Sequence, residues 1–136
     1  MRILVVEDND ACMVFLHETL TNIGGVSRVA IDSASTGEDG LQMYKTAESS
    51  DTPYELIFMD IMLPGIDGLQ TLEEIRAYES NLQLTESQKV KVIMTTALDD
   101  STKASRAFFQ GGAISYMTKP ITPGKILEEM KKFGFM

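Results

Sequence analysis

The sequence predicts one α/β domain of three layers, a doubly wound, five-stranded parallel sheet with helices on both faces. Two observations support this prediction. Short apolar runs alternate five times with segments whose apolar residues recur at helical spacing, a pattern typical of parallel strands joined by right-handed helical crossovers. In addition, 136 residues of which 43% are hydrophobic suit one well-packed domain and are too few for two ordinary ones. We therefore treat residues 1–136 as one domain.

The first unit begins with the segment RILVVED. Ile3–Val6 are four consecutive apolar residues that end on Glu7 and Asp8, as in a parallel strand buried on both faces. A cap at Asn9 or Asp10 is expected to begin the helix that follows. The expected core-facing stripe of this helix consists of Val14, Phe15, Leu16, Leu20 and Ile23.

The second unit follows Gly24 and Gly25, which should end the first helix. A short strand is expected at Val26–Ile31. In the next segment, STGEDGLQMYKTA, Ser35 and Glu38 have the spacing of a capping box, which predicts that a helix begins there. The expected apolar face of this second helix consists of Leu41, Tyr44 and Ala47.

The third and fourth units repeat the strand–helix order. Leu56–Met59 predicts a strand, and a helix with Leu69, Leu72 and Ile75 on its inner face is expected from Gly68. The polar connection over residues 79–89 is longer than is usual between a helix and a strand, and we interpret it as a surface insertion. Val90–Ala97 predicts the fourth strand.

The last part of the chain predicts two helices and one strand. Residues 99–112, DDSTKASRAFFQGG, are typical of a helix closed by glycines, and Ala113–Met117 predict the fifth strand. Thr122 is a plausible cap for the last helix, and Pro123 suits its first turn. The expected apolar stripe of that helix consists of Ile126, Leu127, Met130 and Phe133.

Polar and charged residues stand where the predicted strands end. In parallel sheets of this kind, ligands bind beyond the carboxyl ends of the strands, near the point where strand order reverses. We therefore expect three carboxylates, two hydroxyl groups and one ammonium group to converge at this edge. These residues are Glu7 and Asp8 after the first strand, Asp60 after the third, Thr95 and Thr96 at the end of the fourth, and Lys119 after the fifth.

This group of side chains predicts a magnesium site. Three carboxylates and one ammonium group leave an excess of negative charge, which a divalent cation would neutralise. Oxygen ligands with room for water suit Mg²⁺. The single histidine, His17, lies in the middle of a predicted helix and the single cysteine, Cys12, is isolated, so the sequence does not favour zinc.

Asp60 is the best candidate for a nucleophile in this group. It stands alone at the end of a central strand, and a carboxylate can form an aspartyl phosphate. Transfer of a phosphoryl group then requires positive charge and hydrogen-bond donors around three oxygens. Mg²⁺, Lys119, the Thr96 hydroxyl group and backbone N–H groups after Asp60 could supply them.

The ordered strand-end motifs are Glu7-Asp8, Asp60 within DIMLPGIDG, Thr96-Ala97 and Lys119-Pro120. This set resembles the receiver domains of response regulators in two-component signalling, of the chemotaxis-regulator type, and the match covers essentially the whole chain. The resemblance implies a flavodoxin-like sheet with strand order 2-1-3-4-5. Two departures are the acidic pair, which is often Asp-Asp in the family, and the longer 79–89 connection, whose role the sequence does not reveal.

The resemblance also implies a role for each residue around the metal. Asp60 would be the phosphoacceptor. Asp8 would bind Mg²⁺ directly, Glu7 would bind it through water, and the backbone carbonyl of Met62 would be a further ligand.

A second set of residues would bind the phosphoryl group and respond to it. Thr96, with Ala97 beside it, and Lys119 would contact the phosphoryl group. Tyr116 matches the family's switch aromatic, which turns inward when the threonine moves toward the phosphate. Receivers commonly have a cis Lys-Pro bond, so the bond before Pro120 is a candidate for that form.

These assignments predict a signalling module rather than an enzyme. A histidine kinase or phosphotransfer protein would phosphorylate Asp60, and the face made by the fourth helix, fifth strand and fifth helix would pass the signal to a downstream protein. We expect a monomer or weak dimer. The chain begins at Met1 and stops soon after its last helix, which favours a stand-alone receiver; the alternative is a domain excised from a longer regulator or hybrid kinase.

Two other function classes would require different residues. A Mg²⁺-dependent phosphatase or phosphotransferase with an aspartyl intermediate usually has a second acid two residues after the nucleophile, where this chain has Met62. A flavodoxin-like cofactor carrier should have a loop rich in Ser, Thr and Gly after strand one, and the acidic residues found there would repel a phosphate.

Bulk composition narrows the partners and the compartment. The formal net charge of −8 opposes direct binding to nucleic acid and to anionic membranes. One cysteine cannot form an internal disulfide, and no basic leader followed by an apolar run opens the sequence. No apolar stretch approaches the roughly 20 residues of a membrane helix. We therefore expect a cytoplasmic protein.

Overall fold

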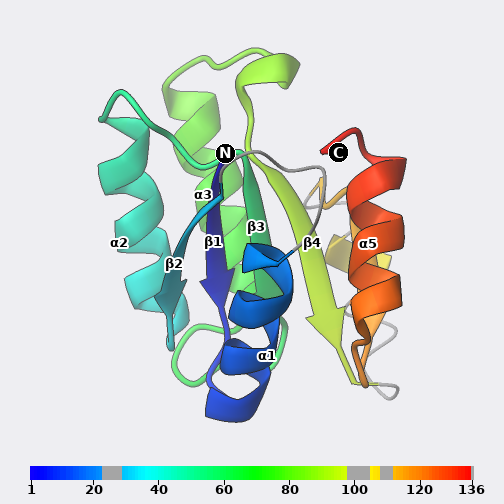
Figure 1. The fold of residues 1–136 in the computed structure, drawn as a ribbon. Helices are drawn as coiled ribbons and strands as arrows, with labels where there is room; N and C mark the ends of the chain where they lie inside the picture. The colour runs from blue at the N-terminus through cyan, green and yellow to red at the C-terminus, as the bar shows by residue number, and fades with distance from the viewer. Residues whose placement is uncertain (23–28, 98–104, 108–111, 136) are drawn as a thin grey trace.

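The computed structural model describes residues 1–22, 29–97, 105–107 and 112–135. Its strands form a five-stranded sheet in which each neighbouring pair is parallel, in the order β2-β1-β3-β4-β5 (Figure 1). The predicted fold class and strand order are thus confirmed. The strands are β1 (Arg2–Val6), β2 (Ala30–Ala34), β3 (Leu56–Asp60), β4 (Lys91–Thr96) and β5 (Ser115–Thr118).

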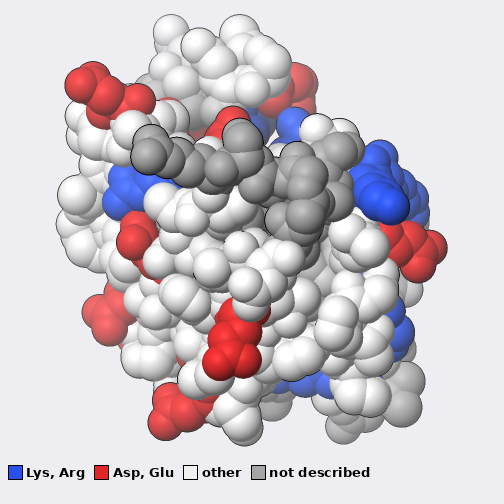
Figure 2. All heavy atoms as spheres, viewed as in Figure 1, with Lys and Arg blue, Asp and Glu red and all other residues white. Residues whose placement is uncertain are grey.

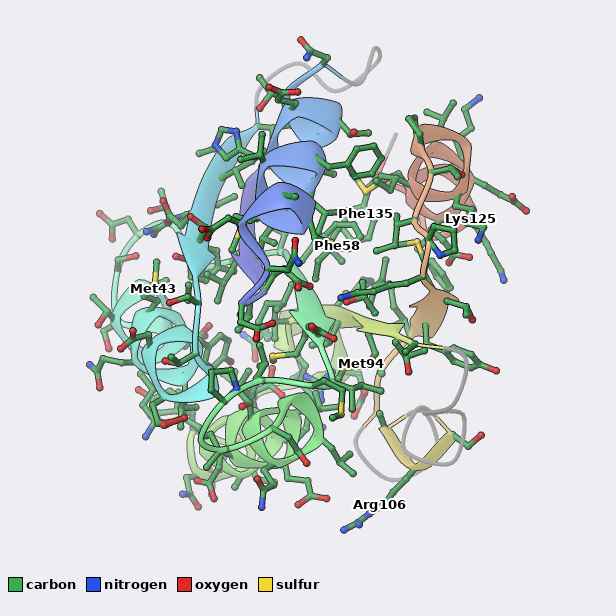
Figure 3. The ribbon with its side chains drawn as sticks, turned by 90° about the horizontal axis from the view of Figure 1, so that it is seen from below. Met43, Phe58, Met94, Arg106, Lys125 and Phe135 are labelled. Carbon is green, nitrogen blue, oxygen red and sulfur yellow. The ribbon has the colours of Figure 1, made fainter. Side chains whose placement is uncertain are left out.

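Helices cover both faces of the sheet. Figure 1 shows α1 and α5 in front of it and α2 and α3 behind, and the view from below in Figure 3 separates the same two layers. The helices are α1 (Asp10–Thr21), α2 (Gly37–Glu48), α3 (Gly68–Asn81) and α5 (Pro123–Lys132), with a short 3₁₀ helix η1 (Glu86–Gln88) in the connection before β4.

Two hydrophobic clusters fill the spaces between these layers. Alternate residues of a strand point to opposite faces. In β1, Leu4 and Val6 belong to the cluster beneath α2 and α3, whereas Ile3 and Val5 belong to the cluster beneath α1 and α5. Every residue of β3 is buried, as its position at the centre of the sheet requires.

The helix starts follow the predicted capping chemistry in α1 and α5. The Asn9 side chain accepts a hydrogen bond from the Cys12 backbone N–H, and the Thr122 side chain accepts one from Lys125. Pro123 stands in the first turn of α5, as predicted.

The predicted start of α2 is wrong by one residue. Its cap is Thr36, which accepts a hydrogen bond from the Asp39 backbone N–H, so Ser35 and Glu38 do not form a capping box. The Glu38 carboxylate instead accepts a hydrogen bond from the backbone N–H of Ile66. Both Ser35 and Thr36 can cap a helix, and only the fold decides between them.

The second strand and the first helix also differ from expectation. The strand lies at Ala30–Ala34 rather than Val26–Ile31, because it pairs with β1 from Arg2↔Ala30 to Val6↔Ala34. Val14, expected in the core, is 54% exposed. The rest of the predicted stripe of α1 is buried at Leu16 and Leu20 and half-buried at Phe15.

Some predicted features lie outside the described residues. These are Ile23, Gly24 and Gly25, the first part of the predicted second strand, and most of the helix expected over residues 99–112, of which residues 105–107 are described and helical. None of the helices in the described ranges has the length and apolar character that a membrane span requires.

Charged side chains of both signs are spread over the face seen in Figure 2. Acidic side chains are scattered across it, and basic side chains are prominent at the right, over α5. Three lysines, Lys125, Lys131 and Lys132, come from this helix. The excess of acidic residues in the chain is therefore distributed rather than concentrated in one block of this face.

Candidate functional site

The carboxyl ends of β1 and β3 place three carboxylates together. The two strands are neighbours at the centre of the sheet, and Figure 3 looks onto the edge where they end. Glu7, Asp8 and Asp60 each offer an oxygen within 4.8 Å of the others. The predicted acidic cluster is therefore present. It lies at the switch point of the sheet, where β2 and β3 flank β1 on opposite sides.

The three carboxylates differ in exposure. Glu7 is 2% exposed and Asp60 is 4% exposed, whereas Asp8 faces solvent. Burial, followed by the negative charge of Asp60, raises the pKa of Glu7 from an ordinary value of 4.5 to about 7, against the opposing effect of Lys119. The cluster thus has two buried acids and one that water can reach.

Lys119 joins the two buried acids. Its Nζ atom lies 3.2 Å from Oδ2 of Asp60 and 3.3 Å from both carboxylate oxygens of Glu7. Burial lowers the pKa of the Lys119 ammonium group, but the charges of Asp60 and Glu7 outweigh burial, so the net shift is upward. The amine therefore stays charged at neutral pH and partly compensates the two carboxylates.

Backbone N–H groups also bind the two buried carboxylates. The Met62 N–H donates to Oδ1 of Asp60 at 3.2 Å, and the Asn9 N–H donates to Oε1 of Glu7 at 3.2 Å. Each oxygen of Asp60 thus has one donor, Met62 or Lys119, and the carboxylate has a defined orientation at the end of β3.

A loop over residues 61–67 leads from Asp60 to α3 and is tightly packed at its base. The Gly68 N–H donates to the Ile61 carbonyl at 2.8 Å, which closes the loop. A side chain at position 68 would overlap the Asp60 carbonyl group, so glycine is required directly behind the phosphoacceptor candidate. Leu63 is buried and anchors the loop in the core.

The hydroxyl and switch candidates lie on β4 and β5. Thr96 is buried, and its hydroxyl group donates to the Ala97 carbonyl at 3.0 Å rather than to an acidic residue. Thr95 pairs with Asp60 across the sheet. Tyr116 is 44% exposed, so its ring has the outward orientation.

The segment that carries Lys119 is attached to β4. The backbone N–H of Lys119 donates to the Thr96 carbonyl at 2.7 Å, which places the lysine beside the end of β4. The peptide bond between Lys119 and Pro120 is cis, the form that the resemblance implies. The structure thus brings Glu7, Asp8, Asp60 and Lys119 into one cluster. Thr96 is joined to it through the backbone of Lys119, and Tyr116 is exposed on β5.

Two residues that contact Asp60 or the loop after it are predicted from the sequence only as parts of helix starts. Glu38, read there as half of a capping box, bonds the loop that follows Asp60, and Gly68, read as the start of a helix, packs against the Asp60 backbone. The run DIMLPGIDG signals a tight turn through its glycines, but the contact with Glu38 joins residues 28 positions apart and has no local signature.

Comparisons with known proteins agree with the fold. The chain is 34% identical over 136 residues to hybrid signal transduction histidine kinase L of Dictyostelium discoideum, which covers 98% of this chain and 7% of that protein. It is 32% identical over 129 residues to chemotaxis protein CheY of Treponema pallidum, covering 95% of this chain and 79% of that protein.

A solved structure has the same fold. It is the Saccharomyces cerevisiae receiver domain of Ssk1, crystallised with the histidine phosphotransfer protein Ypd1, with a TM-score of 0.80, 23% identity, and coverage of 100% of this chain and 90% of that one. The chain spans 7% to 50% of the length of the first three curated relatives. Because residues 3–131 also match the family model described as the response regulator receiver domain, this chain belongs to the response regulator receiver family.

Proposed function

We propose that this chain accepts a phosphoryl group on Asp60 and passes the signal on through a change of conformation. One observation carries the proposal: the Asp60 carboxylate, 4% exposed at the end of the central strand, lies 3.2 Å from the Lys119 amine and shares a cluster with Glu7 and Asp8. A buried nucleophile beside a fixed positive charge is the arrangement that transfer of a phosphoryl group needs.

The transfer requires little more than positioning. An oxygen of Asp60 forms a bond to phosphorus while the bond from phosphorus to an imidazole nitrogen of the donor breaks. The electron pair of that bond returns to the imidazole, which regains a proton from solvent. The Lys119 ammonium group, already oriented by Asp60 and Glu7, pairs with the negative charge of the transferred group.

The acidic cluster fits Mg²⁺. Its donors are all oxygen atoms, Asp8 is open to water, and the three carboxylates together with Lys119 leave an excess of two negative charges. Asp8, Asp60, the Met62 carbonyl and, through water, Glu7 would hold the ion. When bound, Mg²⁺ would screen the carboxylates from the incoming phosphoryl group and neutralise part of its charge.

Thr96 and Tyr116 would convert phosphorylation into a change of surface. The Thr96 hydroxyl group, now bonded to the Ala97 carbonyl, would turn to the phosphoryl group. The exposed Tyr116 ring would then move inward, changing the face around β5 and α5. The phosphoryl group acts by biasing states that the domain already samples.

The family supports a proposal for the donor and the output. Histidine kinases are among the relatives, so a phosphohistidine on a kinase or phosphotransfer protein is the proposed donor, and the partner reached through the face around β5 and α5 is a downstream protein. We infer that the domain does not turn over a small substrate, because Met62, two residues after Asp60, has no proton to give to a leaving group.

Intact-mass analysis after incubation with Mg²⁺ and a small acyl phosphate tests the proposal. We expect the native chain to gain one phosphoryl group, and Asp60→Asn to gain none. Asp67→Asn, which changes an acid at the other end of the same loop, should react like the native chain. An equal gain in Asp60→Asn would overturn the assignment, and repeated turnover of a phosphomonoester would favour the phosphatase alternative.

A further inference from the structure

We propose that Glu38 is a positioning residue that holds the loop over residues 61–67 in the conformation needed for metal binding and phosphoryl transfer. The inference rests on the proposed function, because this loop begins at Asp60 and carries Met62. Glu38 lies in the first turn of α2, far from both residues in the sequence.

The contact between Glu38 and the loop consists of a hydrogen bond and close packing. Oε1 of Glu38 accepts a hydrogen bond from the Ile66 N–H at 3.1 Å. The same carboxylate lies against Gly65, where an added methyl group would overlap it. Gly65 has a φ of 75°, a left-handed conformation that side chains rarely adopt, so the turn there is both specific and in contact with Glu38.

The rest of the loop shows why this contact is needed. Its base is closed by the bond from Gly68 to Ile61, and Leu63 anchors it in the core. Pro64 and Gly65 at its tip are exposed. Within the described residues, the bond from Ile66 to Glu38 is the hydrogen bond that ties the tip to another element, and Figure 3 shows the loop passing beside the first turn of α2.

The start of α2 is itself fixed against the same loop. Gly37 packs so closely against Ile66 and Thr71 that an added methyl group would overlap both. The first turn of α2 is therefore a rigid base from which the Glu38 carboxylate reaches the loop tip. Met62 is two residues from the exposed tip and its N–H binds Asp60, so a loosened tip would allow its carbonyl and N–H groups to move.

The chain offers a matched control. Asp39 is the next residue of α2, carries the same charge and is also exposed; within the described residues, its side chain makes no hydrogen bond or ion pair. Asp39→Ala therefore removes one negative charge beside the same helix start without touching the loop. Glu38→Gln keeps a carbonyl oxygen that can accept from Ile66, whereas Glu38→Ala does not.

Three measurements test the inference. In Glu38→Ala we expect faster hydrogen exchange of the amides of residues 62–66, a three- to tenfold weaker Mg²⁺ midpoint by calorimetric titration, and a similarly slower uptake of the phosphoryl group. Glu38→Gln and Asp39→Ala should stay within about twofold of the native chain in each measurement, because the first keeps an oxygen that accepts from the Ile66 N–H and the second does not touch the loop.

The outcomes separate this inference from the proposed function. If the native chain takes up no phosphoryl group, the proposed function fails, and amide exchange still decides whether Glu38 orders the loop. If Glu38→Ala only lowers the melting temperature and matches Asp39→Ala in the Mg²⁺ midpoint, Glu38 is merely structural and the inference is wrong. A full defect in Glu38→Gln would assign the effect to charge and would also overturn it.

Discussion

Lys119 Nζ lies 3.2 Å from Oδ2 of Asp60 and 3.3 Å from both oxygens of Glu7, so one amine bridges the two buried acids of the site. The bridge joins β1, β3 and the segment after β5: Lys119 is 112 residues from Glu7 and 59 residues from Asp60 along the chain. In the absence of metal, Lys119 is the group that compensates the buried carboxylates. Under the proposed function, the same amine would pair with a phosphoryl group on Asp60.

Replacing Lys119 by methionine should separate these two roles. We expect uptake of the phosphoryl group to slow about a hundredfold, the usual cost of losing one preorganised donor. The rise in melting temperature on adding Mg²⁺ should become larger, because the ion then neutralises three carboxylates without competition from the amine. Lys131→Met, an exposed change on α5, should leave both measurements as in the native chain. A smaller rise with Mg²⁺ in Lys119→Met would contradict this account.

The raised pKa of Glu7 makes Mg²⁺ binding depend on pH. The folded apo protein holds an extra proton on Glu7 between pH 4.5 and about 7, so this group stabilises the apo protein more at pH 6 than at pH 8. Mg²⁺ needs the carboxylate, so the rise in melting temperature on adding Mg²⁺ should be larger at pH 8 than at pH 6. The apparent affinity should fall toward about tenfold per pH unit below the pKa of Glu7.

Thermal melts with and without Mg²⁺ at pH 6, 7 and 8 check this expectation. Glu7→Gln cannot titrate at this position, and its Mg²⁺ response should vary much less over the same range. If the native chain and Glu7→Gln show the same pH dependence, another group controls binding. His17 is the single histidine of the chain and is exposed on α1, so His17→Gln is a useful second control.

The acidic cluster could be predicted from the sequence because its position depends on two things only: where the apolar strands end, and which edge of the sheet those ends share. A run such as Leu56–Met59 can be satisfied only by burial on both faces, and parallel strands end at one edge. A charge that follows such a run, as Asp60 does, must therefore face the charges that follow the neighbouring strands. The order of the strands was the additional information, and the resemblance supplied it.

The features that the sequence did not predict depend on contacts between distant residues. The edge strand β2 reads AIDSA, a mixed segment whose limits are decided by pairing with β1 rather than by its own pattern. Val14 was expected in the stripe because it is apolar, but it lies on the solvent-facing side of α1, where His17 and Glu18, one turn further on, are also exposed. Glu38 has a plausible local role as a cap and acquires another one only because α2 packs beside the loop after Asp60.

A buried network at the opposite edge of the sheet should contribute strongly to stability. Glu79 is fully buried; its carboxylate accepts hydrogen bonds from Tyr44 at 3.2 Å, the Val90 N–H at 2.8 Å and Arg76 at 2.7 Å. The network connects α2, α3 and the residue before β4. Removing Glu79 takes the acceptor away from the buried Tyr44 hydroxyl group and the Val90 N–H, and such losses are costly.

We therefore expect Glu79→Ala to lower the free energy of unfolding by about 3–5 kcal/mol, measured by urea denaturation. Tyr44→Phe should cost about 1 kcal/mol, because it removes one hydrogen bond and keeps the ring. Glu74→Ala, an exposed change on the same helix, should stay within about 0.5 kcal/mol of the native chain. A cost below 1 kcal/mol for Glu79→Ala would show that this network adds little net stability.

Gly68 and Gly124 should respond in opposite directions to the same change to alanine. Both stand in the first turn of a helix, Gly68 in α3 and Gly124 in α5. A methyl group at Gly68 would overlap the backbone of Asp60 and Ile61, whereas one at Gly124 would meet nothing closer than 4.0 Å, the Thr122 hydroxyl oxygen. In an open helical position, alanine is more stable than glycine by about 0.5–1 kcal/mol.

Gly124→Ala should therefore stabilise the domain by about 0.5–1 kcal/mol, and Gly68→Ala should destabilise it by about 1–3 kcal/mol, the usual range for overpacking. Because the backbone that must move carries Asp60, Gly68→Ala should also slow uptake of the phosphoryl group, while Gly124→Ala should not. Urea denaturation and intact-mass kinetics on the same samples check both effects. If Gly68→Ala loses stability but reacts at the native rate, the loop adjusts without moving the carboxylate, and close packing behind Asp60 does not aim the nucleophile.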